Sequence, residues 1–429
     1  MEDPPPPAAV SADWANLPAD ILSIIQGELE FADLFRAAAV CTSWRAAVRS
    51  LRRHGLYTRP QTPCLLYSTA AAGTRAVELY SLADKSTRTI PLPDPPIAER
   101  SVVGSSHGWL VTADSRSELH LLNPATGEQL ALPPVATIEQ VSPVLDDAGS
   151  LQRYDISFYD AGLPRKEYRP PQPYELDQLR LFLYLKVVLS CDPSRGDCVL
   201  MMIYNPYRQL AFARIGSSKW RWITTSFRES MYSDCIYHNG AFYAMNLQGG
   251  IHRYTIEGSC ATRHVIFKDT LLFTPADNVY IARTSSGDVL QIWRTTSCPI
   301  EDSVETHTTH IEIFKIDFDK QDILDIDSLK DDALFIGHNY SCCLSATDHP
   351  RLLPNHLYFT DDDEYSLMDD DGQHYRRDVG MYNLKDNSVI EIVSPRPWLN
   401  WPTPIWITPS FTKINKYVSI PVFTKFVSV

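Results

Sequence analysis

The sequence lacks the features that would place it in several large functional classes. No apolar run is long enough to span a bilayer. No G-x-S-x-G, Walker, G-x-G-x-x-G or H-E-x-x-H motif occurs, so nothing indicates the common hydrolase, nucleotide-binding or metalloprotease sites. Basic residues are outnumbered, with 39 Lys and Arg against 52 Asp and Glu and a formal net charge of −13. Because nucleic-acid binding depends on a basic surface, this balance argues against a nucleic-acid partner.

Metal-binding and disulfide patterns are also missing. The nine cysteines are odd in number and irregularly spaced, and no C-x-x-C pair occurs. A structural zinc site needs paired ligands at set spacing, which neither His307 and His310 nor the adjacent Cys342 and Cys343 provide. We therefore predict no metal and no cofactor, and cysteines that are buried and reduced.

The N-terminal part of the chain contains three helical patterns. In the first, Pro18 suits an N-terminal helical position and is followed by an apolar stripe with helical spacing. The stripe consists of Ile21, Leu22, Ile25 and Leu29, and Ile24 widens it. Similar stripes begin at Leu34 and at Trp44. The sequence thus predicts three short helices over residues 18–54.

These helices carry more apolar surface than so short a segment can bury. About forty residues normally need outside help to be stable. An apolar face of this kind is most simply interpreted as a docking surface, the alternative being a helical cap packed on the following domain. Burying one Leu or Ile contributes roughly 1.5–3 kcal/mol, so a few such side chains outweigh an association cost of several kcal/mol.

The order of three short motifs resembles the F-box. The motifs are Leu17-Pro18-Ala19-Asp20-Ile21-Leu22, Asp33-Leu34-Phe35-Arg36 and Val40-Cys41-Thr42-Ser43-Trp44-Arg45. F-box proteins carry substrates to SCF-type cullin–RING ubiquitin ligases by docking on a small Skp-type adaptor. By this resemblance, the residues that form or support the adaptor contact are Leu17, Pro18, Ile21, Leu22, Ile25, Leu34, Val40, Cys41 and Trp44. Seven arginines and no Asp or Glu lie between Leu34 and Val77, which suits the acidic adaptors of the family.

After residue 55 the pattern changes to short strand-like runs separated by turns. The clearest block covers residues 106–132, and similar blocks cover 186–225, 234–267, 280–326 and 333–393. The first block, 64–91, is short of a strand that Ile405-Trp406-Ile407 can supply. Repeated four-strand units joined at the two chain ends are typical of a β-propeller. We expect six blades, and seven remain possible because residues 141–173 could contain further strands.

This second region also resembles a known family. Four of its motifs are similar to those of the plant KIB-type F-box/β-propeller family, namely 104–110, the turn 123–127, 355–361 and 401–406. The resemblance implies a plant substrate receptor that binds an unknown target protein through its propeller. The expected organisation is a disordered Pro-rich leader over 1–12, an all-α F-box over 13–55 and a mainly β propeller over 56–429.

Two other interpretations stay open. A propeller hydrolase or lectin would need convergent acids or a metal at the propeller mouth. His107 follows two serines, but adjacent strand side chains point to opposite faces, so Ser106 and His107 are expected to lie in a turn or blade rather than form a dyad. A scaffold whose F-box does not engage the adaptor would have nearly the same sequence.

Two further expectations concern surroundings and surface. The acidic, proline-rich N-terminal residues resemble neither a secretory signal nor a presequence, so we expect the cytoplasm, the nucleus or both, and no membrane partner. The acidic clusters 361–364 and 369–371 do not follow the EF-hand order. They are predicted to form a solvated loop that could contact a basic substrate.

Overall fold

The computed structural model describes residues 14–54, 56, 57, 59–159, 169–223, 231–269, 276–297, 307–362, 377–392 and 401–413. The predicted leader and the second acidic cluster lie outside these residues. The described chain forms two compact units, one of residues 14–61 with Phe411–Lys413 and one of Thr62–Ser410. None of its helices is both long and apolar enough to cross a membrane.

The first unit contains the three predicted helices. After a short 3-10 turn, η1 (Trp14–Asn16), they are α1 (Ala19–Gly27), α2 (Phe31–Val40) and α3 (Thr42–Arg53). Pro18 immediately precedes α1, where a missing N–H costs nothing, and its carbonyl accepts the amide of Leu22. The apolar stripes of the helices face one another, so that the core of this unit consists of Leu22, Phe31, Ala32, Leu34, Ala37, Ala47, Val48, Leu51, Tyr57 and Phe411.

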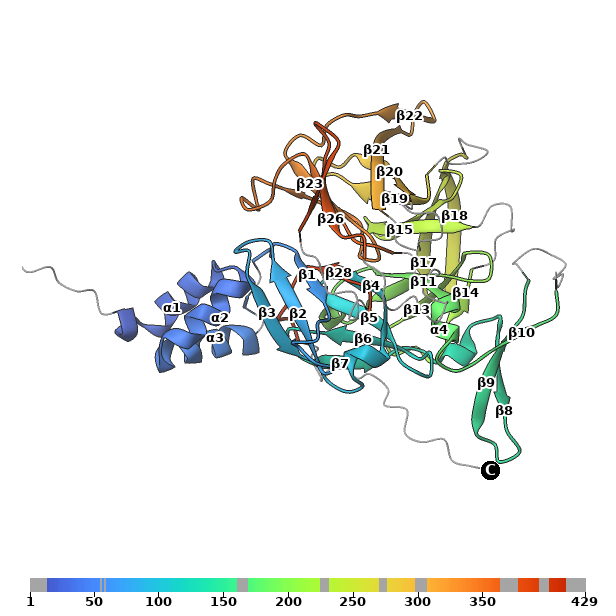
Figure 1. The fold of residues 1–429 in the computed structure, drawn as a ribbon, viewed down its shortest axis with the longest axis horizontal. Coiled ribbons are helices and arrows are strands. Elements are labelled where there is room, and N and C mark those ends of the chain that lie inside the picture. The colour runs from blue at the N-terminus through green and yellow to red at the C-terminus, as the bar shows by residue number, and fades with distance from the viewer. Residues whose placement is uncertain are drawn as a thin grey trace, which may run out of the picture. The chain divides into compact units, whose positions relative to one another are not determined.

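The second unit is built from β-sheets, as predicted (Figure 1). The first sheet consists of β28 (Ile405–Ile407), β1 (Cys64–Tyr67), β2 (Ala76–Ser81) and β3 (Thr87–Pro91). The second consists of β4 (Ser101–Ser106), β5 (Trp109–Ala113), β6 (Leu119–Asn123) and β7 (Glu128–Ala131). The third consists of β11 (Tyr184–Leu189), β12 (Val199–Tyr204), β13 (Gln209–Arg214) and β14 (Arg221–Trp222). The fourth sheet consists of β15 (Tyr232–His238), β16 (Ala241–Asn246), β17 (Ile251–Glu257) and β18 (Cys260–Phe267). The fifth consists of β19 (Asn278–Arg283), β20 (Val289–Ser297), β21 (His307–Asp317) and β22 (Asp322–Asp325).

A sixth sheet has five strands instead of four. Its order is β24 (Cys342–Ser345), β23 (Asp332–Ile336), β25 (His356–Phe359), β26 (Gly380–Asn383) and β27 (Ser388–Glu391), and β23 runs parallel to β25. Short helical segments lie between sheets at η2 (Ile97–Glu99), η3 (Val135–Thr137) and α4 (Leu179–Leu183), and η4 (Pro193–Arg195) lies between β11 and β12 of the third sheet.

The six sheets are the blades of a propeller. Their first strands follow one another around the axis, because β28 contacts β4, β4 contacts β11, β11 contacts β15 and β15 contacts β19. The ring closes as the sequence predicts: Ile405–Ile407 pairs with β1 in the register Cys64↔Ile407 and Leu66↔Ile405. One sheet therefore combines strands from both ends of the unit.

The irregular stretch 141–173 does contain strands, but they do not make a seventh blade. β8 (Val141–Leu145), β9 (Leu151–Ile156) and β10 (Gln172–Tyr174) form a separate three-stranded sheet. The hairpin of β8 and β9 extends away from the other sheets of this unit (Figure 1). Because β4 and β11 contact each other directly, the second and third blades are neighbours and the ring has six blades among the described residues.

A segment of the sixth blade crosses the middle of the propeller. We call residues Gly337–Ser341, between β23 and β24, the central segment. The amide of Tyr340 donates to the carbonyl of Ser105 on β4 at 2.8 Å, and the hydroxyl of Ser341 donates to Asp234 on β15 at 2.8 Å. The central segment therefore joins the sixth blade to blades on other sides of the ring.

The cysteines only partly follow the expectation of burial. Cys64, Cys198 and Cys235 are buried, whereas Cys260 on β18 is exposed and the other described cysteines are intermediate. All the described cysteines are free thiols. The exposed Cys260 is a correction: it lies on an outer strand, whose side chains alternate between core and solvent.

Candidate functional site

The helical unit exposes large apolar side chains. On α1 and α2 these are Ile21 (40% exposed), Ile24 (65%), Phe35 (37%) and Val40 (61%). Ile21 and Ile24 are three residues apart and so lie on neighbouring positions of the helix surface. Large apolar side chains clustered on so small a unit are typical of a surface that another protein covers.

The nine predicted adaptor residues divide into three groups by burial. Pro18, Ile21 and Val40 are exposed, and Leu17, Ile25, Cys41 and Trp44 are partly buried. Leu22 and Leu34 are each 1% exposed and lie in the core of the helical unit. Those two residues can support an adaptor surface but cannot form it, and the roles of all nine stay predictions.

Two exposed residues were not among the nine. Ile24 is more exposed than Ile21, and Phe35 contacts Phe31 while leaving part of its ring accessible. The sequence carried a signal for Ile24, because this residue widens the apolar stripe of the first helix. Phe35 lies in the second motif and in the second helical pattern, but spacing alone cannot show how much of its ring stays exposed.

The third helix of the same unit exposes basic side chains. Arg45, Arg49 and Arg53 on α3 are exposed, and no acidic residue occurs in that helix. The guanidinium of Arg45 donates to the carbonyl of Ala38 at 3.0 Å, which links the start of α3 to α2. This exposed positive helix can accelerate association with a negatively charged partner.

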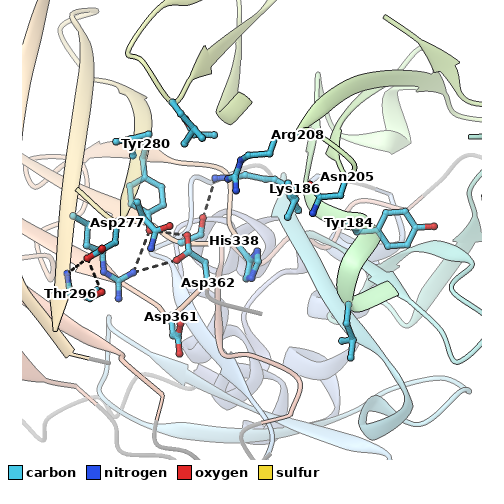
Figure 2. Close-up of a pocket in the computed structure, with 18 of the residues that line it drawn as sticks. Tyr184, Lys186, Asn205, Arg208, Asp277, Tyr280, Thr296, His338, Asp361 and Asp362 are labelled. Atoms are coloured by element: carbon cyan, nitrogen blue, oxygen red, sulfur yellow. Dashed lines mark hydrogen bonds and ion pairs between the residues drawn. The ribbon is translucent and has the colours of Figure 1, made fainter. Parts of the chain in front are cut away.

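The propeller unit contains a cavity of about 430 Å³ at its third to sixth blades. The charged side chains that line it come from five places: β11 (Lys186), the β12–β13 turn (Arg208), the residue before β19 (Asp277), β20 (Arg294) and the segment after β25 (Asp361 and Asp362). Figure 2 shows Arg208, Lys186 and Asn205 on one side and Asp277, Tyr280 and Thr296 on the other. A cavity of this size is typical of a small-molecule site, which is usually 300–1,000 Å³.

Arg294 is the best connected side chain at this cavity. Its guanidinium donates to Asp378 at 2.8 Å and to the carbonyl of Thr360 at 2.9 Å, and its Nε donates to the hydroxyl of Thr308 at 2.8 Å. Burial disfavours the charged form, but the surrounding Tyr280 and Asp378 outweigh it and raise the pKa of Arg294. Arg294 therefore stays protonated and holds the fifth and sixth blades together.

The first acidic cluster is not the solvated loop that was predicted, as far as its described residues show. Asp361 is buried and pairs with Arg377 at 3.3 Å. Asp362 accepts the hydroxyl of Tyr280 at 2.8 Å and lies 3.7 Å from Arg294. The prediction was wrong for these two residues because Arg377 and Arg294, which pair with them, are distant in the sequence. A sequence pattern does not show which of the many arginines lies beside a given aspartate.

His107 lies in a turn, as expected. It has a positive φ of 53° and precedes Gly108 with φ 82°, and this pair joins β4 to β5 through the register Ser106↔Trp109. His107 lines a second cavity of about 60 Å³; part of its side chain is exposed, and partial desolvation by the surrounding protein lowers its pKa. Trp109 is fully buried. Within the described part of the chain, no group of three or more His, Cys, Asp or Glu side chains is arranged to hold a metal ion.

A three-helix unit with exposed apolar residues and a six-bladed propeller together define an F-box protein of the propeller type. Comparison with known families agrees, since an F-box-like model matches residues 14–56 and a KIB1-4 beta-propeller model matches residues 79–383. This chain belongs to the KIB1-4 β-propeller family of F-box proteins.

Relatives in Arabidopsis thaliana match between 76% and 92% of the chain at low identity. One F-box protein is 22% identical over 92% of this chain and 98% of its own length. F-box only protein 7 is 23% identical over 76% of this chain and 79% of its own length. F-box protein KIB4 is 22% identical over 81% of this chain and 86% of its own length. The shared features are therefore those of an F-box substrate adaptor.

Proposed function

We propose that this chain is the substrate-receptor subunit of an SCF-type cullin–RING ubiquitin ligase. The helical unit docks on a Skp-type adaptor, and the propeller binds the target protein through loops between its blades. The chain acts by binding and contributes no catalytic group, and it works in the cytoplasm or nucleus. The observation that carries this proposal is the exposed apolar surface of a unit that matches the F-box.

The energetics of that surface support docking. Ile21, Ile24 and Val40 are exposed in the free chain, so a partner that covers them gains their burial energy. Each contributes roughly 1.5–3 kcal/mol when fully buried. An acidic substitution on this surface would instead force a charge into an apolar interface, which costs several kcal/mol. Such a variant therefore separates docking from folding better than a core substitution does.

Co-purification with a Skp-type adaptor tests the proposal. The full chain would be compared with I21D, V40D and a matched control, V265D, which places the same charge on the exposed Val265 of the propeller. We expect the first two variants to lose adaptor recovery by more than tenfold and V265D to match the wild type. If I21D and V40D recover as much adaptor as the wild type, or if no adaptor co-purifies with any form, the receptor role is excluded.

A further inference from the structure

Most charges around the propeller cavity are paired within the protein. Lys186 lies 2.6 Å from Asp234 and also donates to the carbonyl of Gly337 at 3.0 Å. Arg294 pairs with Asp378 and Arg377 pairs with Asp361 at the distances given above. Within each of these three pairs, the positive and the negative charge neutralise each other. They leave the charges of Arg208, Asp277 and Asp362 to be accounted for.

Arg208 is a half-buried guanidinium that has no salt bridge to any carboxylate of the described residues. Its Nε donates to the carbonyl of Tyr232 at 3.0 Å, which fixes the side chain, and burial lowers its pKa while Asp362 partly opposes that effect. Tyr207 and Arg208 both have positive φ, 68° and 49°. Two successive non-glycine residues in this conformation are strained, and strain of this kind concentrates at functional sites.

Two carboxylates at this cavity lie outside these three pairs. One oxygen of Asp277 accepts the amide and the hydroxyl of Thr296 at 2.6 and 2.9 Å. One oxygen of Asp362 accepts the hydroxyl of Tyr280, while its other oxygen accepts no hydrogen bond among the described residues and lies 3.7 Å from the guanidinium of Arg294. Figure 2 shows Arg208 and Asp277 on different sides of the cavity. Among the described residues, therefore, neither Arg208 nor Asp277 has an opposite charge at salt-bridge distance, and Asp362 shares the guanidinium of Arg294 with Asp378.

We propose that this cavity binds a ligand with one carboxylate and one cationic nitrogen. The carboxylate pairs with Arg208, and the cationic nitrogen pairs with Asp362 and Asp277. A guanidinium matches a carboxylate through two parallel hydrogen bonds. A dianion such as phosphate suits the cavity less well, because these carboxylates repel it. An apolar ligand would leave the Arg208 charge desolvated without a partner.

Two sources can supply this pair of charges. One is a free amino acid, and the other is a peptide segment with an acidic and a basic side chain. The ligand site lies in the propeller unit and does not depend on adaptor docking by the helical unit. Failure of either proposal leaves the other standing, because adaptor recovery and ligand binding are measured separately.

Calorimetry and thermal-shift measurements on the full chain test the proposal in two arms. The first arm uses each of the twenty free L-amino acids, with N-acetyl and methyl-ester forms as controls that lack one charge. The second arm uses the N-acetylated, C-amidated peptide Glu-Ala-Lys and its Gln-Ala-Lys and Glu-Ala-Gln analogues. Binding in one arm identifies the source, and removal of either charge is expected to weaken it at least about tenfold.

Variants assign the binding to this cavity. R208Q and D362N are each expected to weaken binding at least about tenfold. R221Q, which changes an exposed arginine of the same blade, should bind like the wild type. Circular dichroism confirms that each variant is folded, and D362N provides an independent test if R208Q is not. The proposal is overturned if neither arm binds, if the singly charged analogues bind equally well, or if the folded variants keep wild-type affinity.

Discussion

The ring of Phe411 stacks on the ring of Phe31, with centroids 4.9 Å apart and planes 20° from parallel. Phe31 opens the second helix, whereas Phe411 follows β28, the last strand along the described chain. Tyr57 contacts the same ring at 5.5 Å, and the guanidinium of Arg52 lies 4.2 Å from its centre. The helical unit is therefore completed by a residue from the other end of the sequence.

This relationship predicts that Phe411→Ala destabilises the helical unit. Phe411 is buried, and removal of a buried Phe side chain typically costs about 3–5 kcal/mol. We expect a lower denaturation midpoint for this unit and weaker adaptor recovery than for the wild type. Lys413→Ala, which changes an exposed residue of the same segment, is the control. Equal stability of the two variants would show that the ring contact contributes nothing.

A second prediction concerns the ion pair at the middle of the propeller. Lys186 and Asp234 are both buried, and Asp234 also accepts the hydroxyl of Ser341 and the amide of Ile281. Removal of one partner of a buried pair costs about 3–5 kcal/mol, because it leaves an uncompensated charge. Lys186→Met should therefore lower the free energy of unfolding of the propeller by about that amount.

Chemical denaturation followed by tryptophan fluorescence measures the effect of Lys186→Met. Lys315→Met is the matched control, since Lys315 pairs with Asp288 at 2.9 Å but both side chains are about two-fifths exposed. Exposed pairs contribute only about 0–1 kcal/mol. A control that loses as much stability as Lys186→Met would mean that burial of the pair is not the cause.

The sequence predicted the parts of the fold that depend on local patterns. The strand at Ile405–Ile407 was identifiable because it is a short apolar run and because the first block needed a fourth strand. The central segment could not be predicted, since its bonds to Ser105, Lys186 and Asp234 join positions more than a hundred residues apart. Long-range polar contacts of this kind leave no periodic trace in the sequence.

The same limit applies to the candidate sites. The helical stripes predicted an adaptor surface, but they did not indicate that Leu22 and Leu34 belong to the core of the helical unit itself. The propeller cavity had no sequence signal, because Arg208, Asp277 and Asp362 come from three blades. A run of aspartates looks like a solvated loop unless the arginines that fold onto it are known.

A third prediction concerns the reactivity of Cys191. A hydrogen bond with Cys198 lowers the pKa of the Cys191 thiol to about 7, while that interaction and burial raise the pKa of Cys198. Cys191 is partly accessible, and the thiolate is the nucleophile. Iodoacetamide labelling of Cys191 should thus be half-maximal near pH 7, with Cys198 unlabelled.

Mass spectrometry across pH 5.5 to 9 follows this labelling, with the exposed Cys260 as an internal comparison. Because the folded pKa is depressed, the stability contributed by the Cys191 thiolate is present above its unfolded pKa and is lost as the pH falls through about 7. Cys198→Ala should move the labelling midpoint of Cys191 to higher pH. An unchanged midpoint would rule out the hydrogen bond as the cause.

The last prediction concerns a close approach of two blades at Gly104. Gly104 on β4 faces the backbone carbonyl of Val187 on β11, and a Cβ atom at Gly104 would overlap that oxygen. The Val187 backbone belongs to the inner strand of the next blade and cannot rotate away as a flexible side chain can. Gly104→Ala should therefore destabilise the propeller by about 1–3 kcal/mol, as overpacking of a core typically does.

Gly27→Ala is the control, because a Cβ there meets nothing within 4 Å. Thermal unfolding of both variants decides the point: if Gly104→Ala unfolds at the wild-type temperature, the blades can separate enough to admit a methyl group, and contact between inner strands does not fix the six-bladed ring.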